Sequence, residues 1–135
     1  MKISKRTARK EALDNGFRSK FEFDFSKKLK SMRKVVKYEA DKIIYMQPEQ
    51  TKTYIPDWKI CNKTYCETKG IFVSSDRKKI LAVIRDNPDI NLYILFQNSK
   101  LTLSKKSKTT YGEWCTKNGI IWADIKDINK WRKWF

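Results

Sequence analysis

The chain has 135 residues, a length that fits one domain. Its 31 lysine and arginine residues outnumber 15 acidic residues, which gives a formal net charge of +16 at pH 7. This balance favours a polyanionic partner, most simply nucleic acid, with an anionic membrane surface as the rival. No apolar run could span a bilayer and no signal peptide is recognisable, so we expect a soluble cytoplasmic protein.

The absence of histidine limits the chemistry available to the chain. Ser-His and Cys-His hydrolytic machinery is excluded, and so is the usual general base. The chain has three cysteines, and an odd number does not make a disulfide framework. A zinc site would need four cysteine or histidine ligands, which the chain does not offer. Any hydrolysis would therefore use carboxylates, lysine and a metal ion.

Residues 1–16 are predicted to form a basic, flexible arm, followed by a folded domain over residues 17–135. We expect the arm to contact phosphates, because basic arms gain affinity by releasing counterions. A solvated tail without a role is the alternative. The basic residues assigned to this contact are Lys5, Arg6, Arg9 and Lys10.

A helix is predicted from residue 17 to about residue 32. Phe17, Phe21, Phe25 and Leu29 recur every four residues and form an apolar stripe. Glu22 lies beside this stripe, so its carboxylate could reach a neighbouring sheet and supply a third acid there. The alternative is a solvated helix glutamate.

Residues 33–46 predict one or two strands with a turn near Ala40-Asp41. Pro48 interrupts the pattern, since proline cannot donate to a strand ladder. A strand resumes over residues 51–55 and leads to Asp57.

Residues 63–69 are short and rich in threonine, tyrosine and cysteine, and they predict another strand. Alternation along a strand places Glu67 and Lys69 on one face. A turn near Asn62-Lys63 can fold Asp57 back beside Glu67. Two carboxylates and an ammonium would then converge, which suits Mg²⁺ (or Mn²⁺) and phosphoryl chemistry. A hairpin with a surface salt bridge is the alternative.

Ile71-Phe72-Val73 is predicted to continue this strand. Ser74-Ser75-Asp76 predicts a helix start, and the helix runs to about Asp86 before Asn87-Pro88. The first turns carry basic residues at a helix end that favours phosphate, although a solvated basic face is the alternative. These residues are Arg77, Lys78 and Lys79.

The rest of the chain predicts a buried central strand over residues 91–96, a basic loop over 97–110, a helix over 111–117, a strand over 120–123 and a helix over 128–135. The aromatic residues of the last helix favour core or dimer packing over base stacking. The element order fits an α/β sandwich with a mixed sheet. The loop lysines expected along a phosphate backbone are Lys105, Lys106 and Lys108.

The central motif, Pro56-Asp57 followed by Glu67-Thr68-Lys69, resembles the Pro-Asp…Asp/Glu-x-Lys signature of restriction-endonuclease-like nucleases. The sequence around this motif is similar to that of the phage endonuclease I family, which resolves four-way DNA junctions. The resemblance extends from about Phe17 to Asp124. The runs that carry it are Phe17-Arg18-Ser19, Thr53-Tyr54, Glu67-Thr68-Lys69-Gly70, Asp76-Arg77-Lys78-Lys79 and Tyr111-Gly112-Glu113.

This resemblance implies a restriction-endonuclease-like core and a domain-swapped homodimer, with residues of about 43–52 bridging the subunits. It implies that Glu22 acts with Asp57, Glu67 and Lys69 of the partner chain, that Asp57 and Glu67 hold Mg²⁺, and that Arg18 joins the DNA-contacting residues.

The function implied is metal-dependent, paired cleavage of four-way (Holliday) junctions and other branched DNA, leaving 5′-phosphate and 3′-hydroxyl ends in the host-cell cytoplasm. A general restriction-like DNA nuclease and a non-catalytic basic DNA-binding protein are the alternatives.

Overall fold

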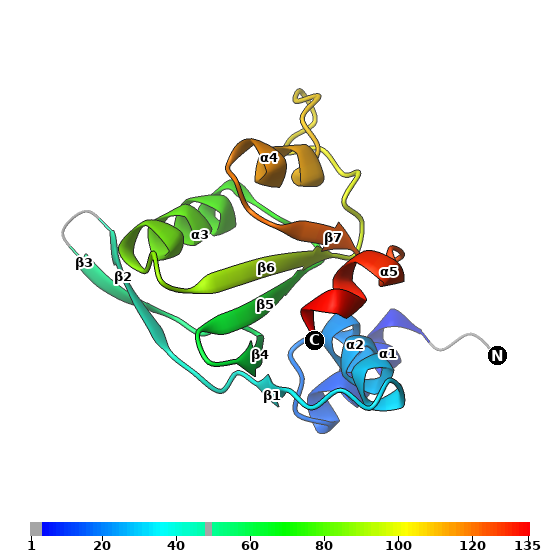
Figure 1. Cartoon of the computed structure of the whole chain (residues 1–135). Coiled ribbons are helices and arrows are strands. Elements are labelled where there is room, and N and C mark those ends of the chain that lie inside the picture. Colours follow the sequence, from blue (N-terminus) through cyan, green and yellow to red (C-terminus); the bar gives the residue numbers. More distant parts are fainter. Residues whose placement is uncertain (1–3, 48–49) are drawn as a thin grey trace. The chain divides into compact units, whose positions relative to one another are not determined.

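The computed structural model describes residues 4–47 and 50–135 (Figure 1). The chain divides into two compact units, Met1–Val35 and Val36–Phe135. The first unit holds helices α1 and α2, and the second holds the sheets and the remaining helices. Within the described residues, no helix has the length and apolar character needed to cross a membrane.

Helix α1 covers Lys5–Asp14, where the sequence pattern gave no regular structure. Ser4 caps it, since the Ser4 hydroxyl accepts a hydrogen bond from the backbone N–H of Thr7 at 3.2 Å. Its buried residues are Ala8 and Ala12, one helical turn apart. Alanine favours a helix but contributes little apolar area, so these two residues do not form a recognisable apolar stripe in the sequence. Residues 1–3 of the predicted arm lie outside the described residues.

Helix α2 covers Lys20–Ser31, close to its predicted bounds. Ser19 is its N-cap, and the Ser19 hydroxyl accepts a hydrogen bond from the backbone N–H of Glu22 at 3.1 Å. Phe25 and Leu29 of the predicted stripe are buried.

The predicted mixed sheet forms the centre of the second unit. It has five strands in the order β1-β4-β5-β6-β7. The first two neighbouring pairs, β1/β4 and β4/β5, are antiparallel, whereas β5/β6 and β6/β7 are parallel. The predicted site is therefore on the middle strand, β5. The bounds of the strands are Lys37–Tyr38 (β1), Trp58–Cys61 (β4), Thr64–Lys69 (β5), Asn91–Phe96 (β6) and Trp122–Asp124 (β7).

Helix α3, Ser74–Asp86, connects the parallel strands β5 and β6 and confirms the predicted helix. The predicted extension of β5 through residues 71–73 is wrong, because β5 ends at Lys69. The chain turns there so that the Phe72 ring can pack edge-on against Phe96 at 5.3 Å between ring centroids. Val73, and not a serine, occupies the N-cap position of α3.

Strands β2, Ile43–Gln47, and β3, Gln50–Tyr54, form a separate antiparallel sheet. Pro48 lies outside the described residues. The pair spans the segment predicted to bridge two subunits, and that role stays a prediction.

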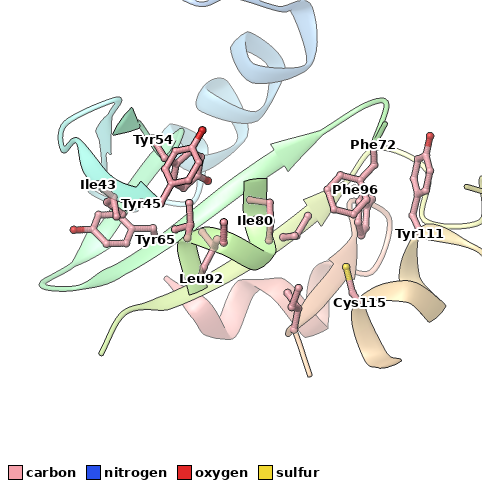
Figure 2. Packing of buried hydrophobic residues seen from close by; sticks show 14 residues of the cluster. Ile43, Tyr45, Tyr54, Tyr65, Phe72, Ile80, Leu92, Phe96, Tyr111 and Cys115 are labelled. Atoms are coloured by element: carbon pink, nitrogen blue, oxygen red, sulfur yellow. The ribbon is translucent and has the colours of Figure 1, made fainter. Parts of the chain in front are cut away.

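The C-terminal part follows the predicted order: α4 covers Tyr111–Lys117, α5 covers Ile128–Trp131, and a 3₁₀ helix covers Arg132–Trp134. The Trp134 ring stacks on Tyr93 at 4.9 Å, so a C-terminal aromatic packs within the chain. Figure 2 shows the buried cluster that joins the antiparallel pair of β2 and β3 (the β2/β3 hairpin), α3, the central strands and α4 in one core.

Candidate active site

The predicted turn between β4 and β5 is present and returns the chain so that Asp57 lies alongside β5. It lies at Asn62-Lys63, and Lys63 adopts a positive φ of 57°. In the β4/β5 register, Trp58 stands opposite Cys66. Asp57 immediately precedes Trp58, so the antiparallel pairing directs it toward Glu67 and Thr68.

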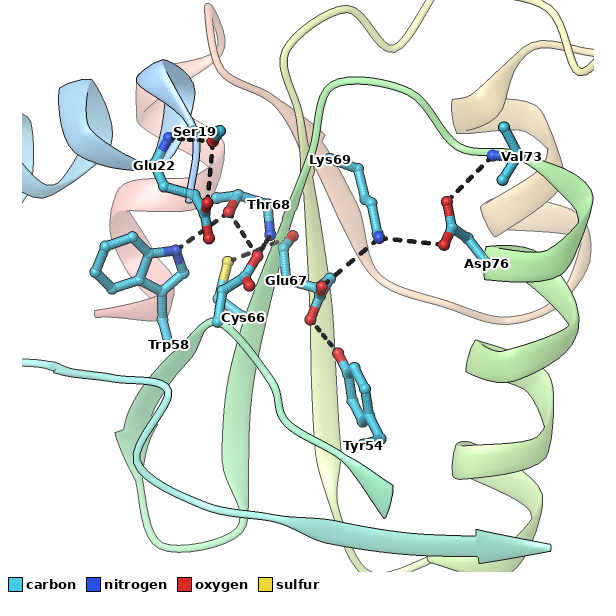
Figure 3. A network of polar contacts seen from close by, with 11 residues as sticks. Ser19, Glu22, Tyr54, Trp58, Cys66, Glu67, Thr68, Lys69, Val73 and Asp76 are labelled. Carbon is cyan, nitrogen blue, oxygen red and sulfur yellow. Dashed lines mark hydrogen bonds and ion pairs between the residues drawn. The ribbon is translucent and has the colours of Figure 1, made fainter. Parts of the chain in front are cut away.

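Asp57 is buried and held by the strand it faces. Its Oδ2 accepts hydrogen bonds from the Thr68 backbone N–H at 2.9 Å and from the Thr68 hydroxyl at 2.7 Å. The Trp58 indole N–H donates to the same hydroxyl oxygen at 3.3 Å (Figure 3). Two bonds to one carboxylate oxygen fix its orientation and stabilise its charged form.

Glu67 is also buried, and its two oxygens have different neighbours. The Tyr54 hydroxyl donates a hydrogen bond to Oε2. The Lys69 ammonium lies 3.8 Å from Oε1, which confirms that Glu67 and Lys69 share a face of β5. Figure 3 shows Glu67 between Tyr54 and Lys69.

Lys69 also interacts with the first turn of α3. Its Nζ lies 3.5 Å from Oδ1 of Asp76. Oδ2 of Asp76 accepts a hydrogen bond from the Val73 backbone N–H at 3.3 Å, so this carboxylate both caps α3 and faces Lys69. The sequence analysis placed Asp76 at a helix start and in a run that carries the resemblance, and it did not predict the contact with Lys69.

Both acids of the motif act electrostatically on the same neighbours. Burial, and then Glu67, raise the pKa of the Tyr54 phenol well above its usual value, and Asp57 adds to the effect. Burial raises the pKa of the Cys66 thiol in the same way, with Asp57 and then Glu67 contributing. Negative charge is therefore concentrated in a buried place, where a cation would be stabilised.

The donor set fits a hard divalent cation such as Mg²⁺, which prefers carboxylate oxygens and uses one or two of them. Glu39, which the sequence analysis did not single out, adds a further acid. One of its carboxylate oxygens lies within 4.8 Å of one from Asp57. The Glu39 backbone N–H donates to the Asp57 carbonyl oxygen at 2.8 Å, and Glu39 has a positive φ of 46°. A single turn residue of this kind belongs to no helix or strand periodicity, so the sequence pattern does not reveal it.

Glu22 belongs to the first unit. There its Oε1 accepts a hydrogen bond from the Ser19 hydroxyl at 3.0 Å, so the carboxylate has a local partner at the start of α2. The Ser-x-x-Glu spacing is the sequence signal for this arrangement. The role of Glu22 at the metal site stays a prediction.

The basic residues predicted to contact DNA lie in three places: on or before the helices of the first unit, in the first turns of α3, and in the loop before α4. Arg77 differs from the others, because its guanidinium donates to the Phe72 carbonyl oxygen at 2.6 Å and supports the turn after β5. The exposed members of the set are Lys5, Arg6, Arg9, Lys10, Arg18, Lys78, Lys105, Lys106 and Lys108.

Residues 3–133 match the family model described as phage endonuclease I. The chain belongs to the phage endonuclease I family. One relative is the endodeoxyribonuclease 1 of Enterobacteria phage T3, 42% identical over 108 residues, which cover 80% of this chain and 71% of the relative. Another is the endonuclease I of Escherichia phage T7, 40% identical over 117 residues, covering 87% and 78%. The match includes the whole span from Asp57 to Lys69 that builds the site.

Proposed function

We propose that this chain is a metal-dependent DNA endonuclease. The observation that carries the proposal is that two buried carboxylates, Asp57 and Glu67, act electrostatically on the same buried groups, while Lys69 lies 3.8 Å from Glu67. Membership of a family whose T3 member is named an endodeoxyribonuclease supports DNA as the substrate.

In this proposal Asp57 and Glu67 hold Mg²⁺, and Mn²⁺ can substitute. The bound ion supplies Lewis-acid activation of phosphate and water. Thr68 fixes the orientation of the Asp57 carboxylate through its two hydrogen bonds. Lys69 stabilises charge on the pentavalent phosphate or orients the attacking water, and Glu22 assists.

The preferred substrate in this proposal is branched DNA, above all the four-way junction. The exposed basic residues of the first unit and of the loop before α4 would bind phosphates, which gives affinity without base reading. A domain-swapped homodimer built on a restriction-endonuclease-like core would place its two active sites at opposite strands of the DNA.

The test compares a labelled immobile four-way junction with its matched linear duplex, each with Mg²⁺, with Ca²⁺ and without metal. Asp57→Asn should abolish cleavage. Asp89→Asn is the control, because Asp89 is an exposed acid paired with Lys63 at 2.7 Å and undergoes the same charge change. We expect it to cut like the wild type.

Paired nicks near the branch, only with Mg²⁺ and lost in Asp57→Asn, support the junction-resolving function. Equal cutting of the duplex supports a general DNA nuclease instead. Tight binding of both DNAs without cutting under any metal contradicts the enzyme and leaves a basic DNA-binding protein.

A further inference from the structure

The Glu67 carboxylate is held from outside the central sheet. Tyr54, the last residue of β3, donates its hydroxyl to Oε2, while Lys69 lies near Oε1. The two oxygens are equivalent, so a half-turn about the terminal bond restores the same arrangement, but any partial twist of the Glu67 carboxylate plane would weaken the Tyr54 bond. The hydroxyl therefore selects one orientation and leaves Oε1 directed to the side of Lys69 (Figure 3).

Tyr54 is itself fixed, so it can impose this orientation. It pairs with Ile43 in the β2/β3 register. Strand β2 is tied to the end of α3, since the Met46 backbone N–H donates to Asp86 at 2.7 Å and the Asn87 side chain donates to the Ile44 carbonyl oxygen at 2.8 Å. Tyr54 is 5% exposed and belongs to the core cluster shown in Figure 2.

We propose that Tyr54 is a positioning residue, which acts through Glu67 to hold the metal-binding carboxylate in its productive orientation. The inference deepens the proposed function and rests on it for the role of Glu67. Partners that orient a metal ligand typically change metal affinity or activity by about 10–100-fold when they are removed.

The experiment substitutes Tyr54→Phe, which removes the hydroxyl and keeps the ring in the core. Mn²⁺ binding to the DNA-free protein is measured by isothermal titration calorimetry, and cleavage is followed against Mg²⁺ and against DNA concentration. We expect the Mn²⁺ dissociation constant and the half-saturating Mg²⁺ concentration to rise about tenfold. The KM for DNA should stay unchanged while kcat at low Mg²⁺ falls.

Tyr65→Phe is the matched control. Tyr65 is buried in the same cluster, and its hydroxyl also donates to a carboxylate, that of Asp41, at 2.8 Å. Both variants lose one phenol–carboxylate hydrogen bond, so their melting temperatures should fall by a similar few degrees. Only Tyr54→Phe should weaken metal binding.

Wild-type metal affinity in Tyr54→Phe, or an equal loss in Tyr65→Phe, would overturn the role of Tyr54. The two proposals fail separately. A wild-type protein that cuts no DNA contradicts the proposed function, whereas weaker Mn²⁺ binding by Tyr54→Phe would still support the positioning role. Unchanged metal binding by Tyr54→Phe beside an active wild type contradicts the positioning role alone.

Discussion

Thr68 serves two buried groups at once, so its hydroxyl is a sensitive point of the site. It donates to Asp57 and accepts from the Trp58 indole. In Thr68→Val the backbone bond to Asp57 remains, but the indole N–H loses its acceptor. We expect the free energy of unfolding to fall by about 1–3 kcal/mol, measured in urea melts. Single-turnover cleavage at saturating Mg²⁺ should fall by about tenfold.

Thr64→Val is the control for this prediction. Thr64 lies on the same strand and the same face, and it is buried, but its hydroxyl contacts Asn62 and Asn91 at 3.4 Å and neither acid. It should change cleavage by less than Thr68→Val. Equal losses of cleavage in the two variants would show that Thr68 acts through the strand and not through Asp57.

Local spacing was sufficient to predict the turn and the strand that carry the proposed site residues. The alternation of a strand and a two-residue turn are short-range constraints, and they brought Asp57, Glu67 and Lys69 to the same strand pair. The contact of Tyr54 with Glu67 joins two different sheets, so no spacing in the sequence reveals it. Glu39 was missed for a different reason, since a turn residue with positive φ carries no periodic signal.

At the scale of elements, the β2/β3 hairpin depends on the last residues of α3. Asp86 accepts hydrogen bonds from the Arg85 side chain and from the Met46 backbone N–H, and these bonds lower its pKa to about 2. A carboxylate whose pKa is lowered in the folded protein stabilises the fold at any pH above its ordinary pKa. This contribution to the free energy of unfolding is lost as the pH falls toward about 2. The attachment of the hairpin to α3 should therefore weaken as the pH falls toward about 2.

Asp86→Ala tests this attachment at neutral pH. Amide hydrogen exchange followed by NMR should become faster at Met46 and along β2, because the N–H loses its acceptor. Asp89→Ala removes another acid with a lowered pKa, which pairs with Lys63 away from the hairpin, and should leave β2 unchanged. Unchanged exchange at Met46 in Asp86→Ala would contradict the attachment.

The elements predicted well were those with strong periodicity or a clear cap. Helix α3 and strand β6 carry long apolar patterns, and Thr110 caps α4 through the backbone N–H of Glu113 at 3.1 Å. The extension of β5 failed because residues 71–73 are β-prone, yet the aromatic cluster around Phe72 decides their path. Tertiary packing of this kind overrides local propensity.

At the scale of the whole molecule, the proposed dimer makes a prediction about which chain supplies each acid. Glu22 precedes the predicted bridging segment, about residues 43–52, and Asp57 follows it. If the segment bridges two subunits, each site combines Glu22 of one chain with Asp57 of the other. Glu22→Gln and Asp57→Asn should each abolish cleavage when the variant is purified alone.

A mixed dimer of these two variants distinguishes a shared site from a site within one chain. Co-expression with different tags allows the mixed dimer to be isolated. In the swapped arrangement one of its sites is intact and the other carries both substitutions, so it should nick one strand of a four-way junction and leave the opposite strand whole. Denaturing gels with each strand labelled in turn would measure this.

If each site instead takes both acids from one chain, every site of the mixed dimer carries one substitution, and the mixture should be as inactive as either variant. A mixed dimer of Asp57→Asn with Glu67→Gln is the control, because both residues follow the bridging segment and would come from the same chain in either arrangement. Each of its sites has one substituted acid, so it should not nick. Nicking by the first pair and not by the second would therefore require a site shared between two chains.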